Sequence, residues 1–198
     1  MLHNKLINRN DIETVFDCLS KEYESLGGNK KVEIYLVGGA AILLKFDYRL
    51  STMDIDAYFD ENDMLNIAIK NTSKKLELPL DWLNQDFTKT PSYSNKIIEK
   101  AKMVSQFGKY IFVYSIESKY LIAMKLKSSR PTGGDLDDII MMIYEMRYKR
   151  LNISYEEIIE AYKELYPDFT NTYDYFLERT KNAFEIPVED FEYLFNKH

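Results

Sequence analysis

One stretch of the sequence decides the fold: Tyr35-Leu-Val-Gly-Gly-Ala-Ala-Ile-Leu-Leu-Lys-Phe-Asp-Tyr-Arg-Leu-Ser-Thr-Met-Asp-Ile-Asp-Ala-Tyr-Phe59. An apolar run ends at the diglycine Gly38–Gly39, and a short apolar segment with helical character follows. Residues 54–59 then alternate between polar and apolar side chains, which predicts a half-buried strand. Because a strand has a period of two, Asp54 and Asp56 are expected on the same face of it.

The two halves of this stretch carry complementary chemistry. Two carboxylates on one strand face can share a divalent cation that also binds a triphosphate. Gly38 and Gly39 lie where a helix begins, so their backbone N–H groups can receive phosphate. Each signal is weak alone, because Asp-x-Asp is common by chance and a tight strand-to-helix turn needs glycine whatever its function. A diglycine followed by Asp-x-Asp fifteen residues later is a much stronger indication.

Composition limits the class of protein. The 198 residues suit one compact domain, or a small domain with a helical appendage, and the net charge of −6 does not favour nucleic-acid backbones. The one cysteine, Cys18, allows no disulfide framework and is expected as a packing residue or half-exposed thiol in a reducing cytoplasmic setting. His3 and His198, the only histidines, lie near the ends, so a histidine-based site is not expected. Neither a signal peptide nor a membrane span is indicated.

Periodicity predicts an α/β (α+β) fold, with a small mixed sheet flanked by helices and followed by a helical C-terminal part. We predict an α/β domain at 1–115 and a helical region at 116–198 that completes the cleft. Trp82 lies in a stretch read as short strand or loop, and is expected as a core anchor rather than a base-stacking residue. The predicted strands are 32–37, 54–59 and 110–114, and the predicted helices are 10–26, 40–46, 63–75, 94–104, 117–129, 135–150, one opening at the capping box Ser154–Glu157, 172–182 and 188–196.

The first block resembles a known signature. Val37-Gly-Gly39 followed by Asp54-Ile-Asp56 is similar to the motif of the DNA polymerase β-type nucleotidyltransferase superfamily. With Arg49 and Thr52 included, it resembles the minimal nucleotidyltransferases related to AbiEii-type toxins of type IV toxin–antitoxin systems. The resemblance implies Mg²⁺ on Asp54 and Asp56, with the NTP phosphates on the diglycine turn.

A second block extends the resemblance to about residues 30–145. It comprises Tyr120-Leu-Ile-Ala-Met-Lys125, then Arg130, then Asp135-Leu-Asp-Asp138. The resemblance implies that Lys125 reaches the nucleotide phosphates and that Asp138 and Asp135 hold it, while Asp137 points elsewhere. Cations at a helix C-terminus and acids at the next N-terminus also offset helix dipoles, so Arg130 and Asp135 have a purely structural alternative. Arg49 and Thr52 either support the strand or contact phosphate.

The sequence departs from the superfamily in its third carboxylate, which serves there as general base. Asp81 and Asp86 are the nearest candidates, and Asn84 is the alternative occupant of that position. The second motif position is Gly39 rather than Ser, which removes a hydroxyl and keeps a backbone donor.

These observations predict a Mg²⁺-dependent nucleotidyltransferase that moves a nucleotide monophosphate from an NTP to an RNA end, a protein hydroxyl or a small molecule. The toxin of a type IV pair, with a cognate antitoxin as partner, is the finer expectation. The alternative is a catalytically weak or inactive nucleotide-binding module with the same fold, and antibiotic nucleotidylation is a third, lower-ranked hypothesis. An RNA acceptor would need a local basic face, for which the candidates are Lys96, Lys100, Lys102, Lys109, Lys119 and Lys127.

Overall fold

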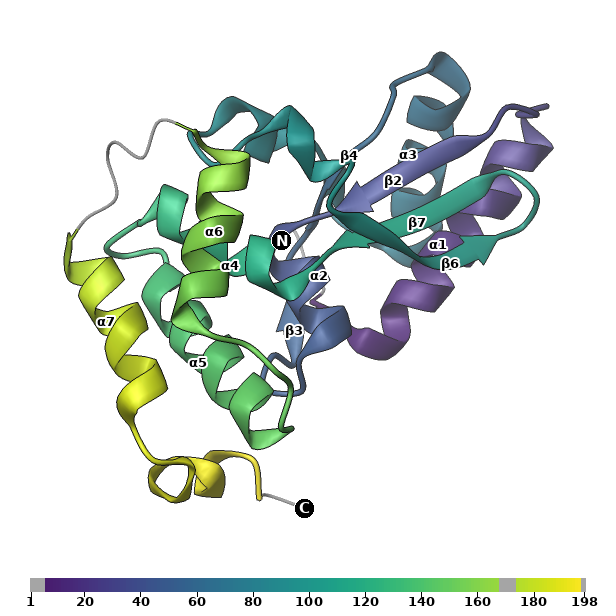
Figure 1. Cartoon of the computed structure of the whole chain (residues 1–198). Coiled ribbons are helices and arrows are strands. Elements are labelled where there is room, and N and C mark those ends of the chain that lie inside the picture. The colour runs from purple at the N-terminus through teal and green to yellow at the C-terminus, as the bar shows by residue number, and fades with distance from the viewer. Residues whose placement is uncertain (1–5, 168–173, 197–198) are drawn as a thin grey trace.

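A five-stranded mixed sheet forms the centre of the computed structural model, which describes residues 6–167 and 174–196 (Figure 1). The strand order is β5-β4-β2-β7-β6, with β2 parallel to β7, β4 parallel to β5, and the β2–β4 and β6–β7 pairs antiparallel. This arrangement confirms the predicted small mixed sheet. The strands are β2 (Val32–Leu36), β4 (Ile55–Tyr58), β5 (Leu83–Asn84), β6 (Ala101–Phe107) and β7 (Ile111–Ile116).

Two amphipathic helices, α1 (Arg9–Ser25) and α3 (Asp63–Leu76), lie behind the sheet in Figure 1. Asn8 caps α1 and completes a capping box with Asp11, so the helix begins slightly before the predicted position. Trp82 is fully buried, and its indole nitrogen donates a 3.1 Å hydrogen bond to the Ile69 carbonyl. Trp82 is therefore a core anchor, as expected, and not a base-stacking residue.

The helical part begins after β7 with α4 (Ser118–Ser128), α5 (Asp135–Tyr148), α6 (Tyr155–Leu165) and α7 (Asp174–Glu185). The predicted capping box of α6 is present between Ser154 and Glu157. The last predicted helix is two short 3-10 turns, η3 (Val188–Asp190) and η4 (Glu192–Leu194). The start of the helix predicted at 172, and both histidines, lie outside the described residues.

The helix predicted at 94–104 is wrong. Only η2 (Asn95–Ile97) is helical there, and the chain then extends into the edge strand β6. The β6–β7 hairpin turns at Gly108, whose φ of +54° favours glycine, and β6 gains a ladder of hydrogen bonds to β7. This long pairing with β7 outweighs a weak helical periodicity, because a local pattern does not report the partner strand.

Four short elements complete the scaffold around the cleft. The helix α2 (Gly38–Lys45) follows β2 directly, and η1 (Asp86–Lys89) follows β5. The predicted loop before Asp54 holds β3 (Ser51–Thr52), which pairs antiparallel with β1 (Ile7–Asn8). These elements bring the loop at 47–54 against the start of α2.

Candidate active site

A cleft of about 670 Å³ lies between the α/β part and the helices α4 and α5. All nine predicted site residues line it: Gly38, Gly39, Arg49, Thr52, Asp54, Asp56, Lys125, Asp135 and Asp138. Arg130 and Asp86 line it as well. The structure therefore places residues from both sequence blocks around one volume.

The turn from β2 into α2 is built for close approach. Gly38 has a φ of +57°, and a Cβ on it would lie 2.9 Å from an Asp56 carboxylate oxygen. Val37 caps α2 without a side-chain hydrogen bond, which leaves the first-turn N–H groups without a side-chain acceptor. These N–H groups and the positive end of the helix dipole favour an anion at this end of the cleft.

The neighbours of Gly39 explain why this motif position holds glycine rather than serine. A Cβ at Gly39 would lie 2.7 Å from the Thr52 hydroxyl oxygen and 3.0 Å from Nη2 of Arg49. Contacts below 3.0 Å require a neighbour to move. Thr52 and Arg49 therefore occupy the space into which a serine side chain would extend.

The two acids stand where β4 meets the cleft. Asp56 is within β4, and Asp54 immediately precedes the strand. Burial, and then the charge of Asp54, raise the pKa of Asp56 to about 6. Burial, and then the charge of Asp81, also raise the pKa of Asp54. Burial and neighbouring carboxylates therefore disfavour the charged form of both acids, and a bound cation would offset this effect.

An amide side chain, that of Asn84, lies where the third carboxylate was sought. In the parallel β4–β5 pair, Asn84 lies directly opposite Asp56. Asp86 follows two residues later and lines the cleft, where its carboxylate accepts from Lys89 at 2.7 Å. Asp81 is absent from the cleft lining. Of the two predicted acids, the structure brings Asp86 into the cleft.

The α4 and α5 side of the cleft carries paired charges of both signs. The Lys125 ammonium is 3.0 Å from Asp135 and 2.7 Å from Asp138, and its side chain is only 12% exposed. Asp135 is fully buried and also accepts from the backbone N–H, Nε and Nη2 of Arg130. Burial by itself would raise the pKa of Asp135, but the hydrogen bonds from Arg130 and the charge of Lys125 hold it well below its usual range. Asp137 was expected to point elsewhere, but it is exposed and lines the cleft together with Asp135 and Asp138.

Asp138 joins the two walls. Besides Lys125, it accepts from Nη1 of Arg49 at 3.0 and 3.1 Å and from the Tyr48 hydroxyl at 3.0 Å. Arg49 is thus anchored by an acid of α5 while its guanidinium lies against Gly39. Its Nε is buried without a hydrogen-bond partner in the structure. Arg49 therefore supports the site and retains one unsatisfied donor.

Sequence reasoning missed Glu145. This carboxylate is 1% exposed and accepts from the backbone N–H groups of Asp47 and Tyr48 at 2.8 to 3.0 Å. Lys149 neutralises it at 2.6 Å. The available signal was its helical spacing, because Glu145 follows Asp138 by seven residues and therefore shares its helix face. Glu145 and Asp138 together fix the loop that carries Arg49.

A comparison with protein families gives a match that spans most of the chain. Residues 14–186 match the family described as "Nucleotidyltransferase of unknown function (DUF6036)". The chain belongs to this family. All nine predicted site residues fall inside the matched region. Comparisons with curated proteins and with solved structures found no match.

Two further findings concern features that the described residues lack. Within residues 6–167 and 174–196, no group of three or more His, Cys, Asp or Glu side chains is arranged to hold a metal ion. In the same described ranges, no helix is long and apolar enough to cross a membrane.

Proposed function

We propose that this protein transfers a nucleoside monophosphate from an NTP to a hydroxyl acceptor with the help of Mg²⁺. The observation that carries the proposal is that one cleft is lined by Asp54 and Asp56, by Lys125 and Arg130, and by the start of α2. Membership of the nucleotidyltransferase family supports the reaction class.

The donor set fits Mg²⁺. This ion prefers oxygen ligands, and proteins commonly hold it through one or two carboxylates while substrate phosphates complete the shell. Asp54 and Asp56 offer such a pair; burial first, and then neighbouring carboxylates, raise the pKa of both, and a bound cation would favour their charged forms. When bound there, Mg²⁺ would neutralise charge on the phosphates and on the departing pyrophosphate.

The chain's own residues orient the triphosphate. N–H groups of Gly38 and Gly39 donate to phosphate oxygens at the start of α2, and the Arg49 guanidinium lies beside Gly39. Lys125 and Arg130 supply positive charge opposite the acids. Because Asp135 and Asp138 hold Lys125 before substrate arrives, little reorganisation is needed when charge develops.

Asp86 is the base in this proposal. The acceptor oxygen forms a bond to the α-phosphorus, the bond from that phosphorus to the bridging oxygen breaks, and pyrophosphate leaves with that oxygen. The acceptor proton passes to a carboxylate oxygen of Asp86. Asp86 suits this role because it lines the cleft beside Asn84, the cross-strand neighbour of Asp56.

A second candidate function is a nucleotide-binding module that transfers poorly or not at all. Asn84 favours it, because the position opposite Asp56 carries an amide that cannot accept a proton from a hydroxyl. The finer hypothesis of a type IV toxin with a cognate antitoxin rests on the resemblance of the two sequence blocks. The identity of the neighbouring gene tests that hypothesis most cheaply.

The deciding experiment incubates the protein with Mg²⁺, each labelled NTP and a mixture of acceptors that includes total RNA. Label transfer that disappears in Asp54→Ala, and persists in the exposed control Asp190→Ala, supports the enzyme. NTP binding without transfer to any acceptor favours the binding module. If Asp54→Ala alters neither binding nor transfer, both functions are refuted.

A further inference from the structure

A pocket of about 520 Å³ adjoins the cleft between the α4–α5 connection and the start of α7, and we call it the side pocket. Arg130, Gly134 and Asp137 line both the cleft and the side pocket. Tyr175 and Phe176, from the first turn of α7, line the side pocket only. Because α7 packs against α5, the side pocket is formed within the helical part of the chain (Figure 1).

The side pocket contains an acid whose state differs from that of its neighbours in the motif. Asp135 and Asp138 both form ion pairs with Lys125. Asp137 is exposed and forms no ion pair with any described residue. Its carboxylate is therefore available to a ligand that enters the side pocket from the cleft.

Arg130 lies between the side pocket and the acids proposed to hold Mg²⁺. Its Nε and Nη2 each donate to Asp135 at 2.9 Å, which fixes the plane of the guanidinium. Burial is the main cause of the raised pKa of Asp56, and the charge of Arg130 opposes it. Arg130 is thus close enough to Asp56 for their charges to interact. An NTP with its α-phosphate beside Asp56 can therefore extend its nucleoside past Arg130 into the side pocket.

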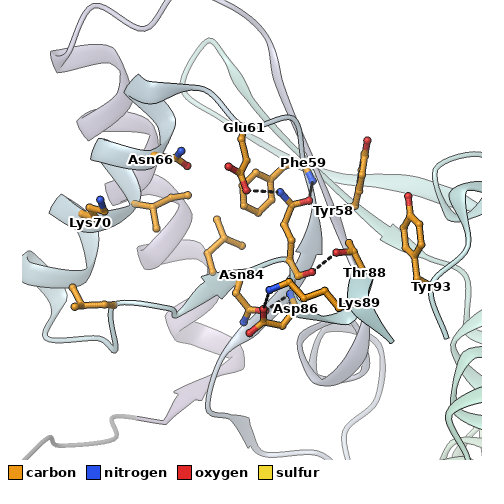
Figure 2. Close-up of a pocket in the computed structure, with 14 residues that line it drawn as sticks. Tyr58, Phe59, Glu61, Asn66, Lys70, Asn84, Asp86, Thr88, Lys89 and Tyr93 are labelled. Atoms are coloured by element: carbon orange, nitrogen blue, oxygen red, sulfur yellow. Dashed lines mark hydrogen bonds and ion pairs between the residues drawn. The ribbon is translucent and has the colours of Figure 1, made fainter. Parts of the chain in front are cut away.

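A different pocket, of about 740 Å³, adjoins the cleft beside β5 (Figure 2). Among the described residues, Asp86 alone lines both this pocket and the cleft, and Lys89 pairs with it at 2.7 Å. In the proposed function Asp86 takes the proton of the acceptor, so the acceptor reaches the α-phosphate from this side. The nucleoside is attached to the same phosphorus and needs another direction, which the side pocket provides.

We propose that the side pocket binds the base of the donor NTP and that it selects guanine. The inference rests on the proposed function and names its donor substrate. An ionised carboxylate has two oxygens that only accept hydrogen bonds. Guanine has two neighbouring donors, N1–H and the N2 amine, on its Watson–Crick edge, whereas the other three bases place an acceptor beside each donor. Asp137 can therefore accept from both donors of guanine, but would face an acceptor in any other base.

The apolar lining of the side pocket suits the flat face of a base. The rings of Tyr175 and Phe176 are inclined at 78°, with centroids 6.4 Å apart, so a base can stack on only one of them. Tyr175 is 59% exposed and Phe176 is 5% exposed, so Tyr175 is the ring that is free to stack. Stacking on an aromatic ring stabilises every base, so the selection of guanine falls to Asp137.

The first test measures binding by calorimetry on the full chain with Mg²⁺ and without acceptor. The ligands are GTP, ATP and ITP, which differs from GTP only by the missing N2 amine. We expect GTP to bind about tenfold more tightly than ITP or ATP, as for a two-bond contact to a base, and this preference to be lost in Asp137→Asn. The control Asp63→Asn removes the same charge from an exposed position in the first turn of α3, and the preference should persist there.

The second test separates the base from the phosphates. Tyr175→Ala should weaken GTP binding at least about fivefold more than it weakens binding of inorganic triphosphate, and Tyr175→Phe should retain GTP binding, because stacking requires the ring and not the hydroxyl. Tyr193→Ala, at another exposed tyrosine, is the control.

The outcomes distinguish the two levels of inference. Equal binding of GTP, ITP and ATP, a preference for ATP, or a preference for GTP that survives Asp137→Asn overturns the assignment of the side pocket while the proposed function stands. An equal loss of GTP and triphosphate binding in Tyr175→Ala overturns the stacking assignment. If none of the NTPs binds, the proposed function is refuted, and the assignment of the side pocket with it.

Discussion

The space beside Gly39 gives the sharpest prediction about this site. Replacing Gly39 by serine restores the residue expected at this motif position, yet the structure predicts that the change is harmful. The new Cβ would meet the Thr52 hydroxyl oxygen at 2.7 Å and Nη2 of Arg49 at 3.0 Å. Thr52 lies in β3 and is buried, so it has little freedom to withdraw.

The expected magnitude follows from two opposing effects. Overpacking of a filled site costs about 1–3 kcal/mol. Serine gains roughly 0.5 kcal/mol over glycine from its better helix propensity. We therefore expect Gly39→Ser to lower the free energy of unfolding by about 1–2 kcal/mol. The displaced Arg49 should also lose part of its contact with Asp138. We therefore expect Gly39→Ser to lower the affinity for Mg–NTP as well as the stability.

A double-mutant cycle with Thr52→Ala checks this reasoning. Removing the Thr52 hydroxyl opens the space that the Cβ and Oγ of the introduced serine would require, so the double variant should recover about 1 kcal/mol relative to the sum of the single changes. Urea unfolding is followed through Trp82, the one tryptophan of the chain and fully buried. Additive single changes, or a stabilising Gly39→Ser, would refute the steric argument.

Three further variants test the charged wall. Lys125→Met should weaken Mg–NTP binding at least tenfold by calorimetry, because roughly 1.4 kcal/mol of attraction to the phosphates is lost. An unchanged affinity would show that Lys125 has only a structural role. Asp135→Asn should cost about 3 kcal/mol at pH 7 in urea unfolding, because Lys125 and Arg130 lose a buried partner. Folding lowers the pKa of Asp135, so its contribution to stability is present above its unfolded pKa and is lost as the pH falls through its folded pKa. The difference in the free energy of unfolding between Asp135→Asn and wild type should therefore shrink only below about pH 4. A difference that stays constant with pH would contradict the assignment. Glu145→Gln should destabilise the fold by about 1–2 kcal/mol and raise KM for NTP through Arg49, and a change in neither quantity would show that the loop at 47–49 is held by other contacts.

The sequence alone predicted what depends on local pattern. The strand, glycine turn, helix and second strand of residues 35–59 follow from period-two and helical spacing and from a φ of +57° that glycine tolerates at Gly38. The capping box at Ser154 likewise marked a helix start correctly. These features are encoded within a few residues of one another, so they can be recognised without knowledge of the fold.

Tertiary structure decided what joins distant segments. β6 is a strand because β7 provides its hydrogen-bond partners, which outweigh the helical pattern of 94–104. Arg49 meets Asp138 across 89 residues, and Glu145 meets the Asp47 N–H across 98. Such contacts depend on how α5 packs against the loop before Asp54, and no local period records that packing. The glycine turn and the acids of residues 35–59 were therefore recognisable in the sequence. The support of Arg49 by Asp138, and the presence of Asp86 rather than Asp81 in the cleft lining, depend on the folded chain.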